Sequence, residues 1–197
     1  MDSIAVFAYG SLVERTSAAT TLGRPVDKVW AASLPGWKRR FSLARHNRTC
    51  EKTFARAVDG SVPEWVLGLN VEPAGSSQAE SVNGCLIEIE PAELERLDAR
   101  ELRYNRVEVA EQITDVAGRR EFGRVVTYVA KSRHLAPAPP PDAVILRSYA
   151  NVVEAGLEAL GAAHTQEYRR NTLPYPAELI DGVLVADSIP DGNPRDW

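Results

Sequence analysis

The feature that most constrains the fold of this 197-residue chain is a succession of short strand-like segments with few helical segments between them. Each segment is apolar or alternates apolar and polar residues, and Gly, Pro and polar turns separate them. We expect strands at 4–7, 26–34, 37–43, 65–71, 82–89, 107–113 and 124–129. A doubly wound fold needs a helix between successive strands, whereas helices are expected here only at 15–22 and 91–102. The pattern therefore predicts an α+β fold, with a mixed or antiparallel sheet that can close into a small barrel flanked by helices.

A proline-rich linker at 137–141 divides the chain into a barrel domain, residues 1–135, and a C-terminal helical extension, residues 136–197. Within the extension, Asp142 is expected to cap an amphipathic helix that runs to Leu160, and a shorter helix follows at 165–171. Neither helix has enough apolar surface to fold alone. We therefore expect the extension to pack on the barrel domain in a single compact unit.

The net charge of −4 and the pI of about 5.5 argue against nucleic acid as a partner, since phosphate binding needs a concentrated basic face. The basic cluster Lys38–Arg40, with Arg45 and Arg48, is predicted to be a solvated strand edge; a docking patch for an acidic group is the alternative. The sequence has no apolar stretch long enough to span a bilayer and no leader at its start, so we expect no membrane partner and a cytoplasmic location.

Conventional catalytic groups are few. Cys50 and Cys85 lack CxxC spacing, so free thiols are expected. The three histidines are scattered singly, which predicts neither a metal site nor a cofactor. Ser11 does not lie in a GxSxG elbow, so it lacks the usual setting of a nucleophile.

The first strand, 4–7, is apolar and soon gives way to the small residues Gly10 and Ser11. In such a turn, the backbone N–H groups of Gly10, Ser11 and Leu12 can converge on an anion or a carbonyl oxygen. Glycine has no Cβ to hold a ligand away from the backbone. An ordinary strand-to-loop turn would give the same pattern, and both interpretations are open at this point.

Glu101 stands out in the helix predicted at 91–102. It follows Leu94 by seven residues and Leu97 by four, so it projects from the same face as these two leucines. Burial raises the pKa of a carboxyl group unless a cation compensates, and such a group can both take and give a proton near neutral pH. The sequence therefore marks Glu101 as a candidate general acid/base.

Other interpretations of this helix are open. Glu101 lies near the helix end, where the face can open to water, and Arg100, Arg103 or Arg106 could pair with it. Asp98, four residues after Leu94, is a competing inward carboxylate.

Four ordered segments of the chain resemble the γ-glutamylcyclotransferase-like superfamily, which includes γ-glutamyl amino acid, γ-glutamylamine and ChaC-type glutathione cyclotransferases. The segments are FAYGSL at 7–12, LPGWKRRF at 34–41, VNGCL at 82–86, and LDARE at 97–101 followed by YNRV at 104–107. They cover most of residues 4–130. The resemblance implies a small mixed α/β barrel around a central cavity.

The resemblance also implies an activity. The γ-glutamyl group of a small amine, amino acid or peptide is cyclised to 5-oxoproline and the amine is released, with Glu101 as acid/base. The loop Tyr9, Gly10, Ser11 and Leu12 is then the substrate-binding loop. Tyr128 matches a tyrosine of the cavity, although a core tyrosine fits its sequence equally well. Because the nucleophile is the substrate's own α-amine, no metal or cofactor is required, and the expected partner is the γ-glutamyl compound.

Some features of the sequence depart from the pattern or leave alternatives. Residues 102–104, Leu-Arg-Tyr, lack the glycines that follow this glutamate in ChaC-type enzymes, which disfavours glutathione as the substrate. A non-catalytic protein that binds a small metabolite is the main alternative, and removal of a γ-glutamyl protecting group is another. The C-terminal helices could close the cavity, select the substrate or form a homodimer contact.

Overall fold

A computed structural model of the protein describes residues 3–75, 80–119, 121–172, 175–191 and 193–194. Its strands are β1 (Ile4–Ala8), β2 (Trp30–Pro35), β3 (Trp37–His46), β4 (Lys52–Arg56), β5 (Trp65–Pro73), β6 (Ser81–Ile89), β7 (Tyr104–Glu108), β8 (Arg124–Ala130), β9 (Ala143–Leu146), β10 (Glu178–Ile180) and β11 (Gly182–Asp187). Its α-helices are α1 (Arg15–Leu22), α2 (Glu93–Arg100), α3 (Arg147–Leu160) and α4 (Ala162–Thr172). Short 3-10 turns include η1 (Ser11–Val13) and η4 (Ser132–His134). The predicted mixed α+β fold is confirmed.

The larger sheet has five strands in the order β2-β6-β1-β8-β7. Its central strand β1 is buried along its whole length, pairing antiparallel with β6 and parallel with β8. Such double burial explains why 4–8 is almost continuously apolar rather than alternating. At the end of β1, Gly84 of β6 lies so close that a Cβ there would sit 2.2 Å from the carbonyl oxygen of Ala8. The close approach of β1 and β6 therefore requires glycine at this position.

A second sheet has the order β10-β9-β5-β3, and β4 pairs with β11 separately. The two larger sheets meet where β8 runs beside β5, and a side chain joins them there: the Ala130 N–H donates to Asn70 Oδ1 at 2.8 Å. Because this contact is not a strand ladder, the sheets stay separate. The barrel expected from the sequence is thus not seen in the described part of the chain, in which each sheet is open.

The sequence predicts a purely helical C-terminal extension, but the structure contains strands there as well as helices. Residues 143–146 form β9, and α3 begins only at Arg147. The run Ala-Val-Ile-Leu is short and apolar, and its two middle residues are β-branched. Because β9 lies between β5 and β10, strand pairing decides its structure where periodicity cannot. β10 and β11 are further strands of this region that the sequence pattern did not predict.

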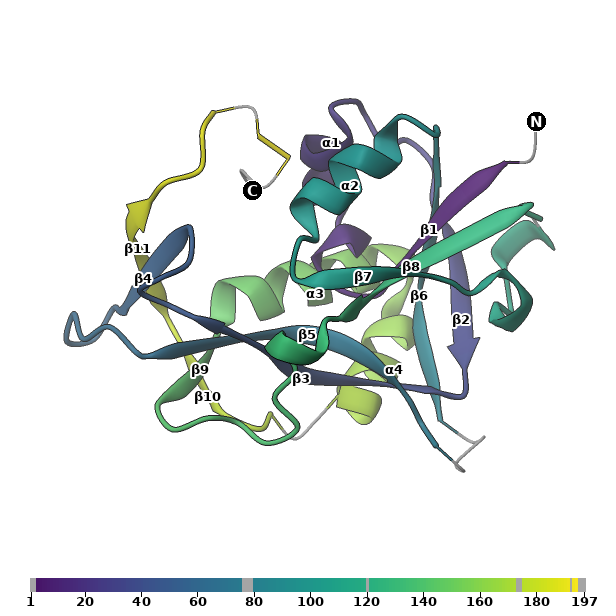
Figure 1. The fold of residues 1–197 in the computed structure, drawn as a ribbon. Helices are drawn as coiled ribbons and strands as arrows, with labels where there is room; N and C mark the ends of the chain where they lie inside the picture. Colours follow the sequence, from purple (N-terminus) through teal and green to yellow (C-terminus); the bar gives the residue numbers. More distant parts are fainter. Residues whose placement is uncertain (1–2, 76–79, 120, 173–174, 192, 195–197) are drawn as a thin grey trace.

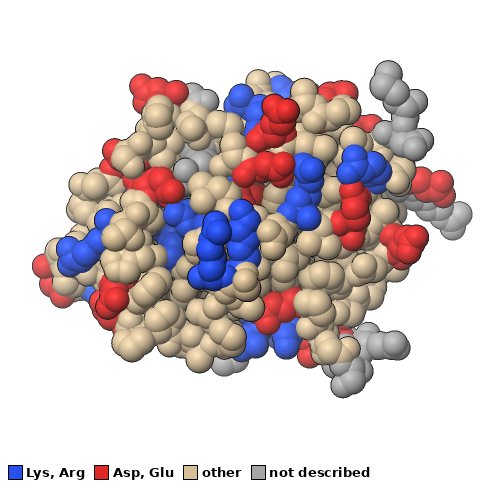
Figure 2. Space-filling view, viewed as in Figure 1, with Lys and Arg blue, Asp and Glu red and all other residues tan. Residues whose placement is uncertain are grey.

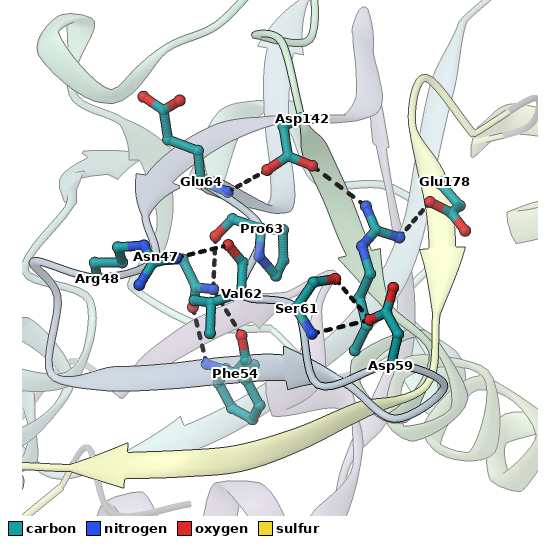
Figure 3. Close-up of polar contacts among 11 residues, drawn as sticks. Asn47, Arg48, Phe54, Asp59, Ser61, Val62, Pro63, Glu64, Asp142 and Glu178 are labelled. Atoms are coloured by element: carbon teal, nitrogen blue, oxygen red, sulfur yellow. Dashed lines mark hydrogen bonds and ion pairs between the residues drawn. The ribbon is translucent and has the colours of Figure 1, made fainter.

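Asp142 therefore does not cap a helix; its carboxylate holds two loops together (Figure 3). It accepts from the N–H of Glu64 at 2.8 Å and from Arg56 at 3.3 Å, and Arg56 also pairs with Glu178. Asn47 braces the neighbouring hairpin, since its amide donates to the carbonyls of Phe54 and Pro63. These contacts attach the C-terminal strands to the hairpin at β4.

The helices lie in two pairs (Figure 1). α1 and α2 are together at the top of the view, while α3 and α4 pack behind the sheets. Cys50 and Cys85 are free thiols, as expected, and burial raises the pKa of Cys85 to about 12. None of the helices in the described ranges combines the length and apolar character needed to cross a bilayer.

Candidate active site

The loop after β1 begins the site. Gly10 precedes η1, in which the N–H of Val13 donates to Gly10 O at 3.0 Å and the N–H of Glu14 to Ser11 O at 3.1 Å. The N–H groups of Gly10, Ser11 and Leu12 come before the first donor of this turn, so the turn itself offers them no acceptor. Close packing explains the glycine, since a Cβ at position 10 would lie 3.1 Å from the Tyr149 hydroxyl.

Arg39 holds this loop from behind. It belongs to the basic cluster that was expected at a solvated edge, but this prediction was wrong for Arg39, which is only 1% exposed. Its guanidinium donates to Tyr9 O at 3.1 Å, to Asn83 O at 2.9 Å and to Asn83 Oδ1 at 2.6 Å, and it stacks on Tyr168 at 4.7 Å. Burial lowers the pKa of Arg39 to about 10, so the group stays charged at neutral pH. The Tyr9 hydroxyl adds a second anchor by donating to Tyr128 O at 2.6 Å.

Glu101 follows the last residue of α2 and turns inward, with its side chain 16% exposed. Its carboxylate pairs with Arg100 Nε at 3.1 Å. Burial raises the pKa of Glu101, and the Arg100 charge and hydrogen bond offset this only in part. A raised carboxyl pKa is the direction of shift that general acid/base chemistry near neutral pH favours.

Arg100 connects Glu101 to the loop. Its side chain is 2% exposed, and Nη2 donates to Ser11 Oγ and to Ser17 Oγ, each at 3.0 Å. The other guanidinium nitrogen, Nη1, donates to Thr21 Oγ1. The Arg100 guanidinium therefore fixes the positions of the Ser11 hydroxyl, the start of α1 and the Glu101 carboxylate relative to one another.

The other pairings proposed for this helix go elsewhere. Arg103 pairs with Glu51 at 2.8 Å, and Arg106 pairs with Asp98 at 2.8 Å. Asp98, the competing carboxylate, has a side chain that is 46% exposed, and it accepts from the Tyr128 hydroxyl at 2.8 Å. Among these carboxylates it is Glu101 that faces the interior.

A small cavity of about 40 Å³ brings the predicted residues together. Its wall includes Tyr9, Gly10, Ser11, Leu12, Glu101 and Tyr128. Tyr104 and Tyr149 also line it and were not predicted. Tyr104 lies in a segment of the family resemblance and Tyr149 on the apolar face of a predicted helix, and neither position distinguishes a cavity tyrosine from a core one. Tyr149 shows that the C-terminal region contributes to this cavity.

The tyrosines act here as neutral groups. Burial raises the pKa of Tyr104, Tyr128 and Tyr149, and the nearby Glu101 charge raises each further. Two of the hydroxyls already have acceptors, since Tyr104 donates to Leu69 O at 2.6 Å and Tyr128 donates to Asp98. Their raised pKa values keep these hydroxyls protonated at neutral pH.

A second cavity, of about 380 Å³, adjoins the first. Ser11, Glu101, Tyr104 and Tyr149 belong to both walls. The larger cavity extends between β3, β4, β5, α3 and β11, so its wall combines residues from both parts of the chain. A molecule bound across the two spaces would pass directly beside the Glu101 carboxylate.

Comparison with known proteins identifies the family of this chain. The family described as "Gamma-glutamyl cyclotransferase, AIG2-like" matches residues 6–143, and the chain belongs to this family. A comparison with curated protein sequences gives no match.

Solved structures share the fold. A crystal structure of YkqA from Bacillus subtilis is 24% identical with a TM-score of 0.57, over 89% of this chain and 56% of that one. A structure titled gamma-glutamyl cyclotransferase is 14% identical with a TM-score of 0.59, over 88% of this chain and 89% of that one. The yeast gamma-glutamyl cyclotransferase specific to glutathione is 14% identical with a TM-score of 0.51, over 87% and 98%. The chain thus spans little more than half the length of YkqA, and at these identities the likeness concerns the fold.

Proposed function

We propose that this protein cyclises the γ-glutamyl group of a small γ-glutamyl compound to 5-oxoproline and releases the attached amine, with Glu101 as general acid/base. The observation that carries the proposal is the inward Glu101 carboxyl, with a raised pKa, in one cavity wall with Gly10, Ser11 and Leu12. Membership of the γ-glutamyl cyclotransferase family supports the reaction class.

The chemistry needs no nucleophile from the protein. The substrate's α-amine attacks its own γ-carbonyl carbon, a five-membered ring closes, and the bond from that carbon to the leaving nitrogen breaks. Holding the glutamyl chain folded makes this attack intramolecular and productive. The small size of the cavity beside the 9–12 loop supports such a folded conformation.

Protons must also move. The α-ammonium loses one proton before it attacks, and the same nitrogen loses a second as the lactam forms. The leaving nitrogen gains one proton as its bond to the carbonyl carbon breaks, and the released amine takes up the other when it becomes an ammonium ion at neutral pH. A single carboxyl of raised pKa can take the proton from the attacking nitrogen and return it to the leaving one. Glu101 has the required burial, and Arg100 fixes its orientation.

The loop would supply hydrogen-bond donors. The N–H groups of Gly10, Ser11 and Leu12 are suited to the substrate's α-carboxylate or to the oxyanion that develops on the γ-carbonyl oxygen. Arg39 and Arg100 keep the loop in place from the two sides. Neither role requires the Ser11 hydroxyl to act as a nucleophile.

The test is Glu101→Gln assayed by 5-oxoproline release from a panel of γ-glutamyl amino acids, γ-glutamylamines and glutathione. Gln keeps the size of the side chain and removes proton transfer, so we expect a fall in kcat of at least about 10²-fold with the fold intact. Glu95→Gln, on the exposed face of α2, is the matched control and should retain activity. Near-normal turnover by Glu101→Gln would contradict the proposal. Tight binding of one compound without turnover by the unaltered protein would favour the metabolite-binding alternative.

A further inference from the structure

The larger cavity is not needed to bind the γ-glutamyl group, which the small cavity beside the 9–12 loop would hold. At about 380 Å³ it falls in the range of sites for small molecules, roughly 300–1,000 Å³. It begins at Glu101, where the scissile bond would lie, so what occupies it is the leaving amine. A short amine would leave most of this space unfilled.

The wall of this cavity is largely apolar. Leu43 and Leu67 come from β3 and β5, Phe54 from β4, and Leu146 and Val152 from β9 and α3. Apolar side chains on several sides favour a leaving group with a sizeable apolar body, because its burial removes apolar surface from water.

Four cationic groups are also present in the same wall, Arg45, Lys52, Arg100 and Arg103, and Arg100 pairs with Glu101. Lys52 pairs with Asp187 at 3.4 Å and Arg103 with Glu51 at 2.8 Å. Arg45 differs, since among the described residues no carboxylate forms an ion pair with it. Its Nη1 donates to Lys52 O at 2.9 Å and to Cys50 Sγ, and its guanidinium lies 5.4 Å from the Phe54 ring.

The electrostatic setting of Arg45 favours an anion. Its side chain is partly buried, and burial together with the nearby Arg103 charge lowers the pKa of Arg45, although the Cys50 and Glu51 interactions act against this. A partly buried guanidinium that forms no ion pair within the described part of the chain gains from a bound carboxylate, with which it can form paired hydrogen bonds. Lys and Arg side chains also gather near the middle of the face on which β4, β5 and β7 lie (Figure 2). A leaving group that placed an additional amine beside Arg45 would bring two like charges together and be disfavoured.

We propose that the leaving group is an amino acid or short peptide with a large apolar side chain, and that Arg45 selects it by binding its free carboxylate. This inference rests on the proposed cyclotransferase reaction. In this proposal Arg45 determines substrate specificity, and Glu101 transfers the protons.

The test compares three substrates on the full chain by 5-oxoproline release: γ-glutamyl-phenylalanine, γ-glutamyl-phenethylamine, which lacks only the carboxylate, and γ-glutamyl-glycine, which lacks the apolar body. We expect kcat/KM to be highest for γ-glutamyl-phenylalanine, by about 10- to 100-fold over the phenethylamine compound, as for a hydrogen bond to a charged group. Arg45→Gln should raise KM for γ-glutamyl-phenylalanine by a similar factor and change kcat/KM for γ-glutamyl-phenethylamine much less.

Arg48→Gln is the matched control, because Arg48 is exposed on the neighbouring loop, where it donates to Val62 O (Figure 3). It should behave as the unaltered protein. Equal kcat/KM for the first two substrates would overturn the inference and leave the cyclotransferase proposal standing, even if Arg45→Gln did not fold. Failure of every γ-glutamyl compound to yield 5-oxoproline would overturn the proposed function and this inference with it.

Discussion

Gly156 lies where the C-terminal region packs against the loop that we propose binds substrate. It lies in α3 against η1, and a Cβ added there would sit 2.6 Å from the N of Glu14 and 2.7 Å from the C of Val13. Ordinary van der Waals contact begins near 3.4 Å, so the helix and the loop would have to separate by about 0.8 Å. Both neighbours are backbone atoms, which cannot rotate away. Gly156→Ala therefore displaces either α3, which carries Tyr149, or the loop that carries Ser11 and Leu12.

Two opposing free-energy terms set the expected stability of this variant. Alanine favours a helix over glycine by about 1 kcal/mol. Overpacking of a buried contact costs about 1–3 kcal/mol. The net effect on the free energy of unfolding is a loss of up to about 2 kcal/mol. Activity should fall more, because a misplacement on the scale of 1 Å can cost about 10²-fold in rate.

The assay is 5-oxoproline release together with urea unfolding of Gly156→Ala. Ala155→Ser adds an atom on the exposed face of the same helix and should keep full activity, with a loss of about 0.5 kcal/mol in the free energy of unfolding from helix propensity alone. We expect kcat/KM of Gly156→Ala to fall by about 10- to 100-fold at a temperature at which the variant is folded. A variant that gains about 1 kcal/mol and keeps full activity would show that helix propensity alone acts here, and that the contact does not position the loop.

Two further predictions concern the cavity. Because the pKa of Glu101 is raised by burial, the acid limb of kcat/KM should lie above the ordinary glutamate value of about 4.3, with activity lost as pH falls through the Glu101 pKa. The raised pKa also means that the folded protein binds a proton at Glu101 more tightly than the unfolded chain does. The stabilisation from this proton is fully present below the unfolded pKa of Glu101 and is lost as pH rises through its folded pKa. Glu101→Gln should thus gain stability relative to the unaltered protein between pH 4 and neutrality in urea titrations; an unchanged difference across that range would contradict the raised pKa. Tyr128→Phe should cost about 1 kcal/mol in unfolding and less than about fivefold in kcat/KM, since its hydroxyl donates to the exposed Asp98. A loss as large as that of Glu101→Gln would instead place the Tyr128 hydroxyl on the substrate.

The N-terminal strands and the inward direction of the Glu101 side chain could be predicted from the sequence, because both depend on the local spacing of apolar residues. Apolar residues at 4–8 and the spacing of Leu94, Leu97 and Glu101 determine which faces are buried, whatever the rest of the chain does. β9 could not be found in this way. Its four residues become a strand because β5 and β10 provide hydrogen-bond partners on either side.

The arginines near the site likewise could not be placed from the sequence. Arg39, Arg45 and Arg48 look alike in the sequence, yet Arg39 is buried under the loop, Arg45 lines the larger cavity and Arg48 is exposed. Their long side chains take whichever hydrogen bonds the surrounding elements offer, and those elements come from distant parts of the chain.

The sequence by itself determined that the chain is α+β, that a small-residue loop follows its first strand, and that Glu101 shares the buried face of its helix. These are properties of neighbouring residues. Only the tertiary structure placed Arg100 between Glu101 and Ser11, brought Tyr149 from the C-terminal region to the cavity, and left the sheets open. These depend on contacts between residues far apart in the chain, and such contacts are set by packing and hydrogen bonding that no local pattern records.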